Sequence, residues 1–248
     1  MYKGKKIAVI APAYNEEGKI GKVVSDIKKK AKLVDKIIVV NDGSKDKTEK
    51  EAKKAGAFVI AHKINQGAGA AIRTGYNYAV EQNFDILITM GGDDQDDPAY
   101  IQKLVSFIVD HNYDFVQGSR YKVKGMEIKQ PLFRKITTIM YSLAFTLAAG
   151  RRITDGSNGF RAFRADVLRK VNINYPSMNR YEMEPYLLLR AIQKGFKFRE
   201  VGVPKYWRTK EYSKMVPFKS WWSILRPIVY SLLGFNLEKR FKRMGIKK

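Results

Sequence analysis

The sequence predicts an α/β fold, in which a mostly parallel sheet carries helices on both faces, and three observations support it. Short apolar runs alternate with amphipathic stretches through the N-terminal half of the 248-residue chain. Short polar turns rich in glycine, asparagine and aspartate separate them. The hydrophobic content of 45% is enough for an ordinary core. Strands that alternate with helices build parallel sheets, which helices then cover.

Five apolar runs bounded by polar turn residues are the expected strands. They are residues 6–11, 36–41, 57–61, 84–90 and 114–118. A helix is expected after each of the first four strands, ending near Lys30, Gly56, Glu81 and His111. Pro98 opens the fourth helix, where proline is well tolerated. Ligands of such sheets bind at the carboxyl ends of the strands, so the loops there are the places to look for function.

Composition excludes several kinds of site. The chain has no cysteine, which excludes disulfides, Cys-ligated zinc and a thiol nucleophile. Its two histidines, His62 and His111, argue against a His-based metal site or a Ser–His relay. The net charge of +23 predicts a polyanionic partner or a negatively charged surface, such as nucleic acid, anionic lipid headgroups or a phosphorylated substrate.

No targeting or membrane-spanning segment is expected. The chain opens at Met1 and passes directly into a strand pattern, without the pattern of a signal peptide. The longest uncharged run, residues 136–150, is shorter than the ~20 residues of a spanning helix. We therefore expect that run to be a buried or an interfacial helix.

The most informative stretch is the acidic loop, residues 91–98, which follows the fourth strand. It places four carboxylates within residues 93–97. Such carboxylates repel each other unless a cation lies among them, and Mg²⁺ or Mn²⁺ binds carboxylate and amide oxygens together with substrate phosphates. Asp93, Gln95 and Asp97 alternate, so in an extended loop they could face one side. The alternative is a solvated acidic turn in front of the next helix.

Two common nucleotide sites do not fit. Gly67 and Gly69 resemble part of a dinucleotide fingerprint, but Ile72 stands where a small residue is needed, and the pattern follows the third strand rather than the first. A Walker A loop is absent from the sequence.

Six motifs, spread over about residues 5–215, together resemble family 2 glycosyltransferases. They are Pro-Ala-Tyr-Asn-Glu at 12–16, Asn-Asp-Gly-Ser at 41–44, Asn-Gln-Gly at 65–67, Gly-Asp-Asp-Gln-Asp-Asp-Pro at 92–98, Gly-Ser-Arg-Tyr at 118–121 and Asp-Gly-Ser-Asn-Gly-Phe-Arg at 155–161. Their arrangement is most similar to the dolichyl-phosphate mannose synthase branch.

The resemblance implies a GT-A-like nucleotide-sugar-binding fold over residues 1–215. It also implies a metal-dependent, inverting transfer of a sugar, with Mn²⁺ or Mg²⁺ as cofactor. The donor would be a nucleoside diphosphate sugar, GDP-mannose being favoured. The acceptor would be a polyprenyl or dolichyl phosphate or a related glycolipid.

The resemblance also assigns the donor site. The implied nucleotide-binding residues are Pro12, Tyr14, Glu16, Asn41, Asp42, Gly92 and Asp93. Asp93 and Gln95 would bind the divalent ion that bridges the diphosphate. The family often has an aspartate two residues before Asp93, where this chain has Gly91. Asp94, Asp97 or the diphosphate itself would then supply the missing oxygen.

Basic residues are expected around the phosphates, although each could also be plain surface charge in a chain with 47 lysines and arginines. The implied catalytic residues are Asp93, Arg120, Arg134, Arg208 and Glu184. The implied acceptor-binding residues are Arg134, Ser157, Asn158, Arg208 and Lys214.

The acceptor decides whether a base is needed. A sugar hydroxyl must be deprotonated, whereas a phosphate is already ionised at neutral pH. Glu182 and Glu184 stand where hydroxyl-directed relatives keep a base, and at most one of them can face the site if the segment is helical. Both could instead complement a helix dipole. Transfer from a UDP-sugar to a saccharide hydroxyl therefore stays open, as does a non-catalytic relative that binds nucleotide sugars, because of Gly91.

The C-terminal segment, residues 216–248, is predicted to form basic amphipathic helices on a membrane surface. From Lys205 onward the chain has twelve lysines and arginines against Glu211 and Glu238. Trp221 and Trp222 lie among short apolar runs, which suits an anionic headgroup region. We expect a peripheral protein on the cytoplasmic face of the membrane. Single-stranded nucleic acid is a poorer partner for a chain with an acidic cleft, and a homodimer interface is a further alternative.

Overall fold

The computed structural model describes residues 1–123, 132–206 and 219–244, with the side chains of 132–134 and 219–220 set aside. The strands are β1 (Ile7–Ala13), β2 (Lys36–Asn41), β3 (Phe58–Ala61), β4 (Ile86–Thr89), β5 (Phe115–Ser119), β6 (Arg161–Arg164) and β7 (Phe198–Gly202). The helices are α1 (Ile20–Lys30), α2 (Thr48–Lys54), α3 (Ala68–Glu81), α4 (Ile101–Val109), α5 (Leu132–Ala149), α6 (Asp166–Lys170), α7 (Met183–Gln193), α8 (Lys219–Leu232) and α9 (Leu237–Met244). Short 3₁₀ turns are η1 (Pro98–Tyr100) and η2 (Arg120–Lys122).

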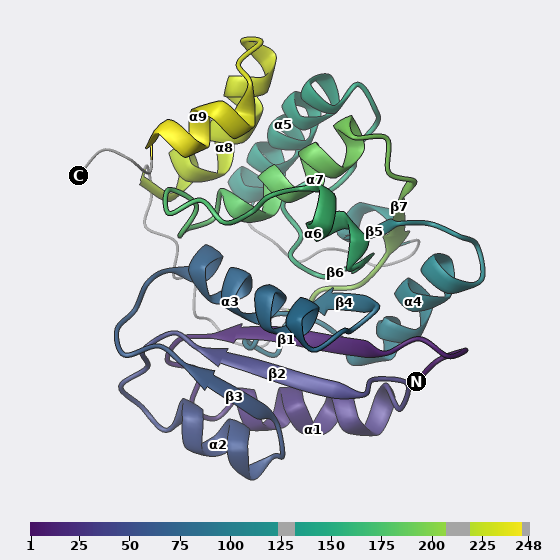
Figure 1. The fold of residues 1–248 in the computed structure, drawn as a ribbon, viewed down its shortest axis with the longest axis vertical. Coiled ribbons are helices and arrows are strands. Elements are labelled where there is room, and N and C mark those ends of the chain that lie inside the picture. The colour runs from purple at the N-terminus through teal and green to yellow at the C-terminus, as the bar shows by residue number, and fades with distance from the viewer. Residues whose placement is uncertain (124–131, 207–218, 245–248) are drawn as a thin grey trace.

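One sheet runs through the molecule in the order β3-β2-β1-β4-β6-β5-β7. The first four of these strands are parallel neighbours, and β7 is parallel to β5. Only β6 runs against its neighbours among the described strands. The predicted mostly parallel α/β sheet is thus confirmed (Figure 1). The five expected strands form close to their expected bounds, whereas β6 and β7 were not anticipated.

Helices cover both faces of the sheet, as expected (Figure 1). Side chains of β1 alternate between the two layers, because successive strand residues point to opposite faces. Ile7 and Val9 belong to the hydrophobic cluster that includes residues of α1, α2 and α4. Ala8 and Ile10 belong to the cluster on the other face, to which α3 contributes. Gly75 lets α3 approach closely, because a Cβ there would lie 2.4 Å from Cγ2 of Ile10.

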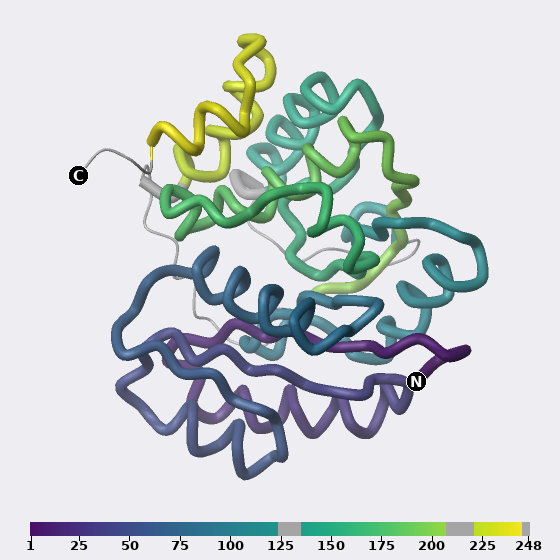
Figure 2. Tube along the Cα trace, viewed as in Figure 1, coloured from purple at the N-terminus to yellow at the C-terminus, as the bar shows by residue number. Residues whose placement is uncertain are grey.

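The C-terminal helices α8 and α9 pack on α5 and α7 (Figure 2). Ile228, Tyr230 and Phe241 are buried in the same hydrophobic cluster as Phe145 of α5. The described part of the predicted C-terminal appendage therefore shares a core with the rest of the chain. The boundary at residue 215 stays a prediction.

Helix α5 has two apolar faces. Tyr141 and Phe145 are buried on one face. The opposite face carries an exposed stripe: Ile136, Ile139, Met140, Leu143 and Leu147, each between 48% and 65% exposed. These positions recur every three or four residues and so lie on one side of the helix. The expected buried or interfacial helix is thus buried on one side only. In the part of the chain that the structure describes, no helix combines the length and apolarity needed to cross a membrane.

Candidate active site

The loops singled out in the sequence meet at one edge of the sheet. Because β1 to β4 are parallel, their carboxyl ends lie together, and the loops after them begin there. Strand β6 runs in the opposite direction, so the loop that precedes it reaches the same edge. The first residue of β6, Arg161, pairs with Thr89 of β4 and Gln117 of β5.

The four carboxylates of the acidic loop differ in their ion-pair partners. Asp94 contacts Lys22 at 2.9 Å, Asp96 contacts Lys205 at 3.2 Å, and Asp97 contacts Lys30 at 3.0 Å. Asp97 also accepts a hydrogen bond from the backbone N–H of Ala99 and so caps η1. Asp93 has no ion pair within residues 1–123, 132–206 and 219–244. Among those residues, Asp93 accepts a hydrogen bond from the backbone N–H of Gln95 at 3.3 Å.

The surroundings of Asp93 disfavour its negative charge. Burial raises the pKa of the Asp93 carboxyl, and the charges of Asp96 and Glu16 add to the effect against the opposing influence of Lys205. A cation beside Asp93 would relieve that unfavourable charge. No cluster of three or more acidic or imidazole side chains that could hold a metal occurs among the described residues, so further ligands would have to be amide oxygens such as that of Gln95, or substrate oxygens.

Asp42, which follows β2, forms hydrogen bonds with the loop after β3. Its Oδ1 accepts a hydrogen bond from the backbone N–H of Gln66 at 2.9 Å, and its Oδ2 accepts one from Gly67 at 2.8 Å. The Nδ1 of His62 lies 2.7 Å from Oδ1. Both oxygens thus shape the loop in front of α3. Asn41 beside it accepts a bond from the Ser44 backbone. The predicted contact of Asp42 with base or ribose stays a prediction.

The loop after β1 lies next to the end of β2. Glu16 is buried and its backbone N–H donates to Oγ1 of Thr48 at 2.7 Å, whereas Tyr14 is 36% exposed. Pro12 is paired with Val40 of β2 in the sheet. These residues therefore lie at the end of β1, beside β2, and their contacts to a nucleoside remain predictions.

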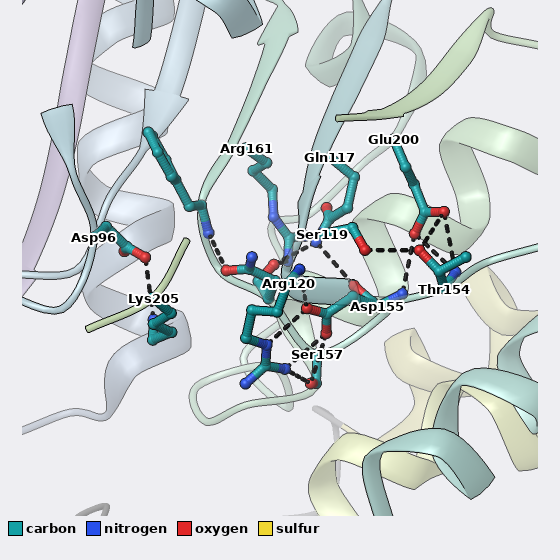
Figure 3. A network of polar contacts seen from close by, with 12 residues as sticks. Asp96, Gln117, Ser119, Arg120, Thr154, Asp155, Ser157, Arg161, Glu200 and Lys205 are labelled. Carbon is teal, nitrogen blue, oxygen red and sulfur yellow. Dashed lines mark hydrogen bonds and ion pairs between the residues drawn. The ribbon is translucent and has the colours of Figure 1, made fainter. Parts of the chain in front are cut away.

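Arg120 is held by a buried carboxylate (Figure 3). Its Nε and Nη2 donate to the two oxygens of Asp155, each at 2.7 Å, and its backbone N–H donates to the same side chain at 3.0 Å. Nη2 also donates to Oγ of Ser157 at 2.7 Å. Glu200 in turn accepts from the backbone of Thr154 and Asp155. Such a bidentate pair fixes the guanidinium plane at the sheet edge.

Arg161 connects the loop before β6 to α7. It is buried, its Nη2 donates to the carbonyl of Asn158 at 2.7 Å, and its Nη1 donates to the carbonyl of Glu184 at 3.0 Å. The Glu184 carboxylate lies 3.4 Å from the same guanidinium. Asn158 is buried as well, and its Nδ2 has no partner among the described residues. This amide is thus a buried donor without a hydrogen-bond partner among the described residues.

The two candidate bases point to different places, as expected. Glu182 lies 3.1 Å from Arg226 of α8, away from the loop before β6. Glu184 faces that loop, since a Cβ on Gly159 would lie 3.2 Å from its Oε1. Of the two, Glu184 is the one at the candidate site.

Three expected basic residues cannot be placed. Arg134 belongs to the first turn of α5, but its side chain lies outside the described set. Arg208 and Lys214 lie outside the described residues altogether. Their predicted contacts with phosphates stay predictions.

Comparison with known proteins fits this geometry. The model of the family "Glycosyl transferase family 2" matches residues 8–171, which include every strand end described above except that of β7. The chain belongs to glycosyltransferase family 2. This family 2 glycosyltransferase is 31% identical to the UDP-N-acetylglucosamine–dolichyl-phosphate N-acetylglucosaminyltransferase of Methanococcus voltae, over 89% of this chain and 95% of that protein. It is 30% identical to the dolichyl-phosphate hexose transferase of Haloferax volcanii, over 94% and 96% of the two chains.

A solved structure supports the fold of this glycosyltransferase. Glucosyl-3-phosphoglycerate synthase from Mycobacterium tuberculosis, in complex with Mn²⁺, UDP and glucosyl-3-phosphoglycerate, superimposes with a TM-score of 0.69. The match covers 94% of this chain and 81% of that chain, at 20% sequence identity. The GT-A-like fold expected from the sequence is thereby confirmed.

Some functional candidates were missed by sequence reasoning. Lys205 and Glu200 gave no signal, because they are two of many charged residues and act through contacts far along the chain. Asp155 and Arg161 belong to a motif that the sequence did show. A role could have been inferred for them, because a buried aspartate and arginine need partners.

Proposed function

We propose that this glycosyltransferase moves a sugar from a nucleoside diphosphate sugar to the phosphate of a polyprenyl lipid. The observation that carries the proposal is the carboxylate of Asp93, which lies in the acidic loop at the sheet edge and has no ion pair among the described residues. A phosphate oxygen of the lipid would attack the anomeric carbon as the bond to the diphosphate breaks, and a single displacement inverts that carbon. The two named relatives, both of which act on dolichyl phosphate by name, support the lipid acceptor.

Metal dependence is part of the proposal. Asp93 and Gln95 would hold Mn²⁺ or Mg²⁺ together with diphosphate oxygens. The ion would compensate the negative charge that develops on the leaving diphosphate. The structural neighbour was crystallised with Mn²⁺ and UDP, which supports this part.

The donor is best determined by a binding screen. GDP-mannose is the donor favoured from the sequence, whereas one relative is named for UDP-N-acetylglucosamine. Thermal-shift measurements with GDP-, UDP- and dTDP-sugars, each with and without Mn²⁺, distinguish these donors. The proposal expects stabilisation by at least one of them, larger with metal. Absence of any shift with every donor would contradict it.

The turnover of a Glu184 variant depends on whether the acceptor is a phosphate or a hydroxyl. Because a lipid phosphate arrives ionised, Glu184→Gln should retain most of the turnover, whereas Arg134→Ala and Arg208→Ala should lose acceptor binding. Turnover against acceptor concentration, measured for the three variants, checks this. A loss of ~10²-fold or more in Glu184→Gln, with unchanged arginine variants, would favour a saccharide hydroxyl instead.

Association with an anionic membrane surface follows from the exposed stripe of α5. The stripe has Lys135 before it and Arg151 and Arg152 after it, all of them exposed. On neighbouring α8, Trp221 and Trp222 are 41% and 50% exposed. Apolar side chains flanked by basic ones and tryptophans suit a headgroup region. We therefore propose a peripheral protein on the cytoplasmic face.

Replacing Leu143 and Leu147 together by serine should weaken binding to anionic vesicles, because both are exposed on the stripe. Vesicle flotation at low and high salt measures this. Ile64→Ser is the matched control, since Ile64 is 71% exposed but lies in the loop after β3. Deleting the C-terminal segment would be a poorer test, because it removes core residues. If the double variant binds vesicles normally but loses a dimer seen by light scattering, the stripe is a homodimer interface.

A further inference from the structure

Lys205 is fixed beside the acidic loop by its backbone. It follows β7, and it forms an isolated antiparallel bridge with Asp96. The backbone N–H of the next residue, Tyr206, donates to the carbonyl of Gln95 at 2.8 Å. These contacts join segments 109 positions apart in the sequence. They bring a lysine side chain to the loop that carries Asp93 (Figure 3).

Among the described residues, the side chain of Asp96 holds the ammonium of Lys205 in place. Its Nζ donates to Oδ1 of Asp96 at 3.2 Å, and Oδ2 of Asp96 accepts from the backbone of Gly91 at 3.3 Å. The Asp96 side chain is 1% exposed, whereas that of Lys205 is 16% exposed. An ammonium has three donors, and within the described ranges Asp96 accepts from one of them, so two can serve a ligand at the loop.

Lys205 also acts on the charge of Asp93. Burial works against its charged form, but the carboxylates of Asp96 and then Asp93 hold the pKa of its ammonium above the ordinary value. The positive charge of Arg120 acts in the opposite direction on the pKa of Lys205. The lysine thus lies among the groups that the proposed function assigns to the diphosphate.

Gly91 affects the charge of the loop beside which Lys205 lies. A Cβ at Gly91 would lie 2.8 Å from Oδ1 of Asp93 and 3.6 Å from Oδ2 of Asp96. A carboxylate side chain at position 91 would therefore add negative charge next to both. This chain lacks that carboxylate and has a lysine ammonium beside the same loop.

We propose that Lys205 is a built-in cation of the diphosphate site, positioned by Asp96. Its ammonium donates to the diphosphate of the donor and supplies positive charge that does not depend on a metal ion. The inference rests on the proposed nucleoside diphosphate sugar donor. It predicts that part of the donor affinity survives when metal is removed, and that this part belongs to Lys205.

Calorimetric titration of GDP and UDP into the protein tests the inference, in EDTA and again with Mn²⁺. In EDTA, Lys205→Met should bind the preferred nucleotide about 10-fold or more weakly than the wild type, since a charge-assisted hydrogen bond is lost. With Mn²⁺, the difference in nucleotide affinity between the wild type and Lys205→Met should be smaller. Lys205→Arg, which keeps a cation, should bind better than Lys205→Met. Lys30→Met is the matched control, because Lys30 pairs with Asp97 of the same loop at 3.0 Å, and it should bind as the wild type does.

A double variant separates diphosphate binding from a purely structural role. If Lys205 served only to neutralise Asp96, then Asp96→Asn combined with Lys205→Met would remove both charges and restore wild-type affinity in EDTA. We expect the double variant to stay weak. Restored affinity, or a Lys205→Met variant that binds normally in EDTA, would overturn the inference while leaving the donor class intact. Failure of the wild type to bind either nucleotide, even with Mn²⁺, would contradict the proposed function and the role of Lys205 with it.

Discussion

Replacing Asp93 by alanine should abolish the metal-supported part of donor binding. Asp93 is the carboxylate of the acidic loop without an ion pair in the described ranges, and its surroundings disfavour its negative charge. Removing it takes away the group best placed to hold Mn²⁺ or Mg²⁺. Calorimetry with the preferred nucleotide sugar, with and without Mn²⁺, measures the effect. Wild-type affinity that rises with Mn²⁺, and variant affinity that does not, is the expected pair of results.

Asp97→Ala is the control for Asp93. Asp97 lies in the same loop, but it caps η1 and pairs with Lys30. Its loss should lower stability by about 1 kcal/mol, as for other helix caps, and leave the response to Mn²⁺ unchanged. An Asp93→Ala variant that still gains affinity from Mn²⁺ would show that the metal, if used, is held elsewhere.

Asp155→Ala should lower the unfolding free energy more than Asp97→Ala or Ser157→Ala. Asp155 is fully buried and accepts from the backbone N–H, Nε and Nη2 of Arg120. Without it the buried guanidinium loses its bidentate ion-pair partner, and breaking such a pair costs about 3–5 kcal/mol. Denaturant unfolding monitored by circular dichroism measures the change in unfolding free energy.

Ser157→Ala provides the comparison for Asp155. Ser157 also contacts Arg120, at 2.7 Å, but it carries no charge. Its loss should cost about 1 kcal/mol, in the range of a single hydrogen bond. Equal effects of the two substitutions would mean that the Arg120–Asp155 charge pair adds little to the stability of this edge.

The sequence was sufficient for the part of the fold that depends on local pattern. The strands β1 to β5 have apolar runs, and the turns between them have glycine and asparagine, so each could be predicted. Strand β6 could not, because its sequence, Arg-Ala-Phe-Arg, begins and ends with charge. It lies between β4 and β5 and pairs with both, and its Arg161 side chain donates to the carbonyls of Asn158 and Glu184. Only tertiary contacts make that strand favourable.

The candidate site was predictable to a similar degree. The acidic loop and its place at the sheet edge followed from the sequence, and the family followed from six motifs in order. The contacts that the charged residues make with one another could not be predicted from the sequence. The contact of Asp42 with a nucleoside stays a prediction, whereas the hydrogen bonds that its two oxygens accept from Gln66 and Gly67 were not foreseen. Lys205 was not singled out, because its pairing with Asp96 depends on how β7 meets the acidic loop.

Transfer of labelled sugar to polyprenyl phosphate in anionic vesicles tests the central claim most directly. The donors are GDP-mannose and UDP-N-acetylglucosamine, each with Mn²⁺, and the products are the glycosylated lipid phosphate and the free nucleoside diphosphate. Our account predicts lipid-linked product with at least one donor, lost in Asp93→Ala and retained in Glu184→Gln. Absence of lipid product with every donor, together with transfer to a soluble saccharide that Glu184→Gln abolishes, would contradict it.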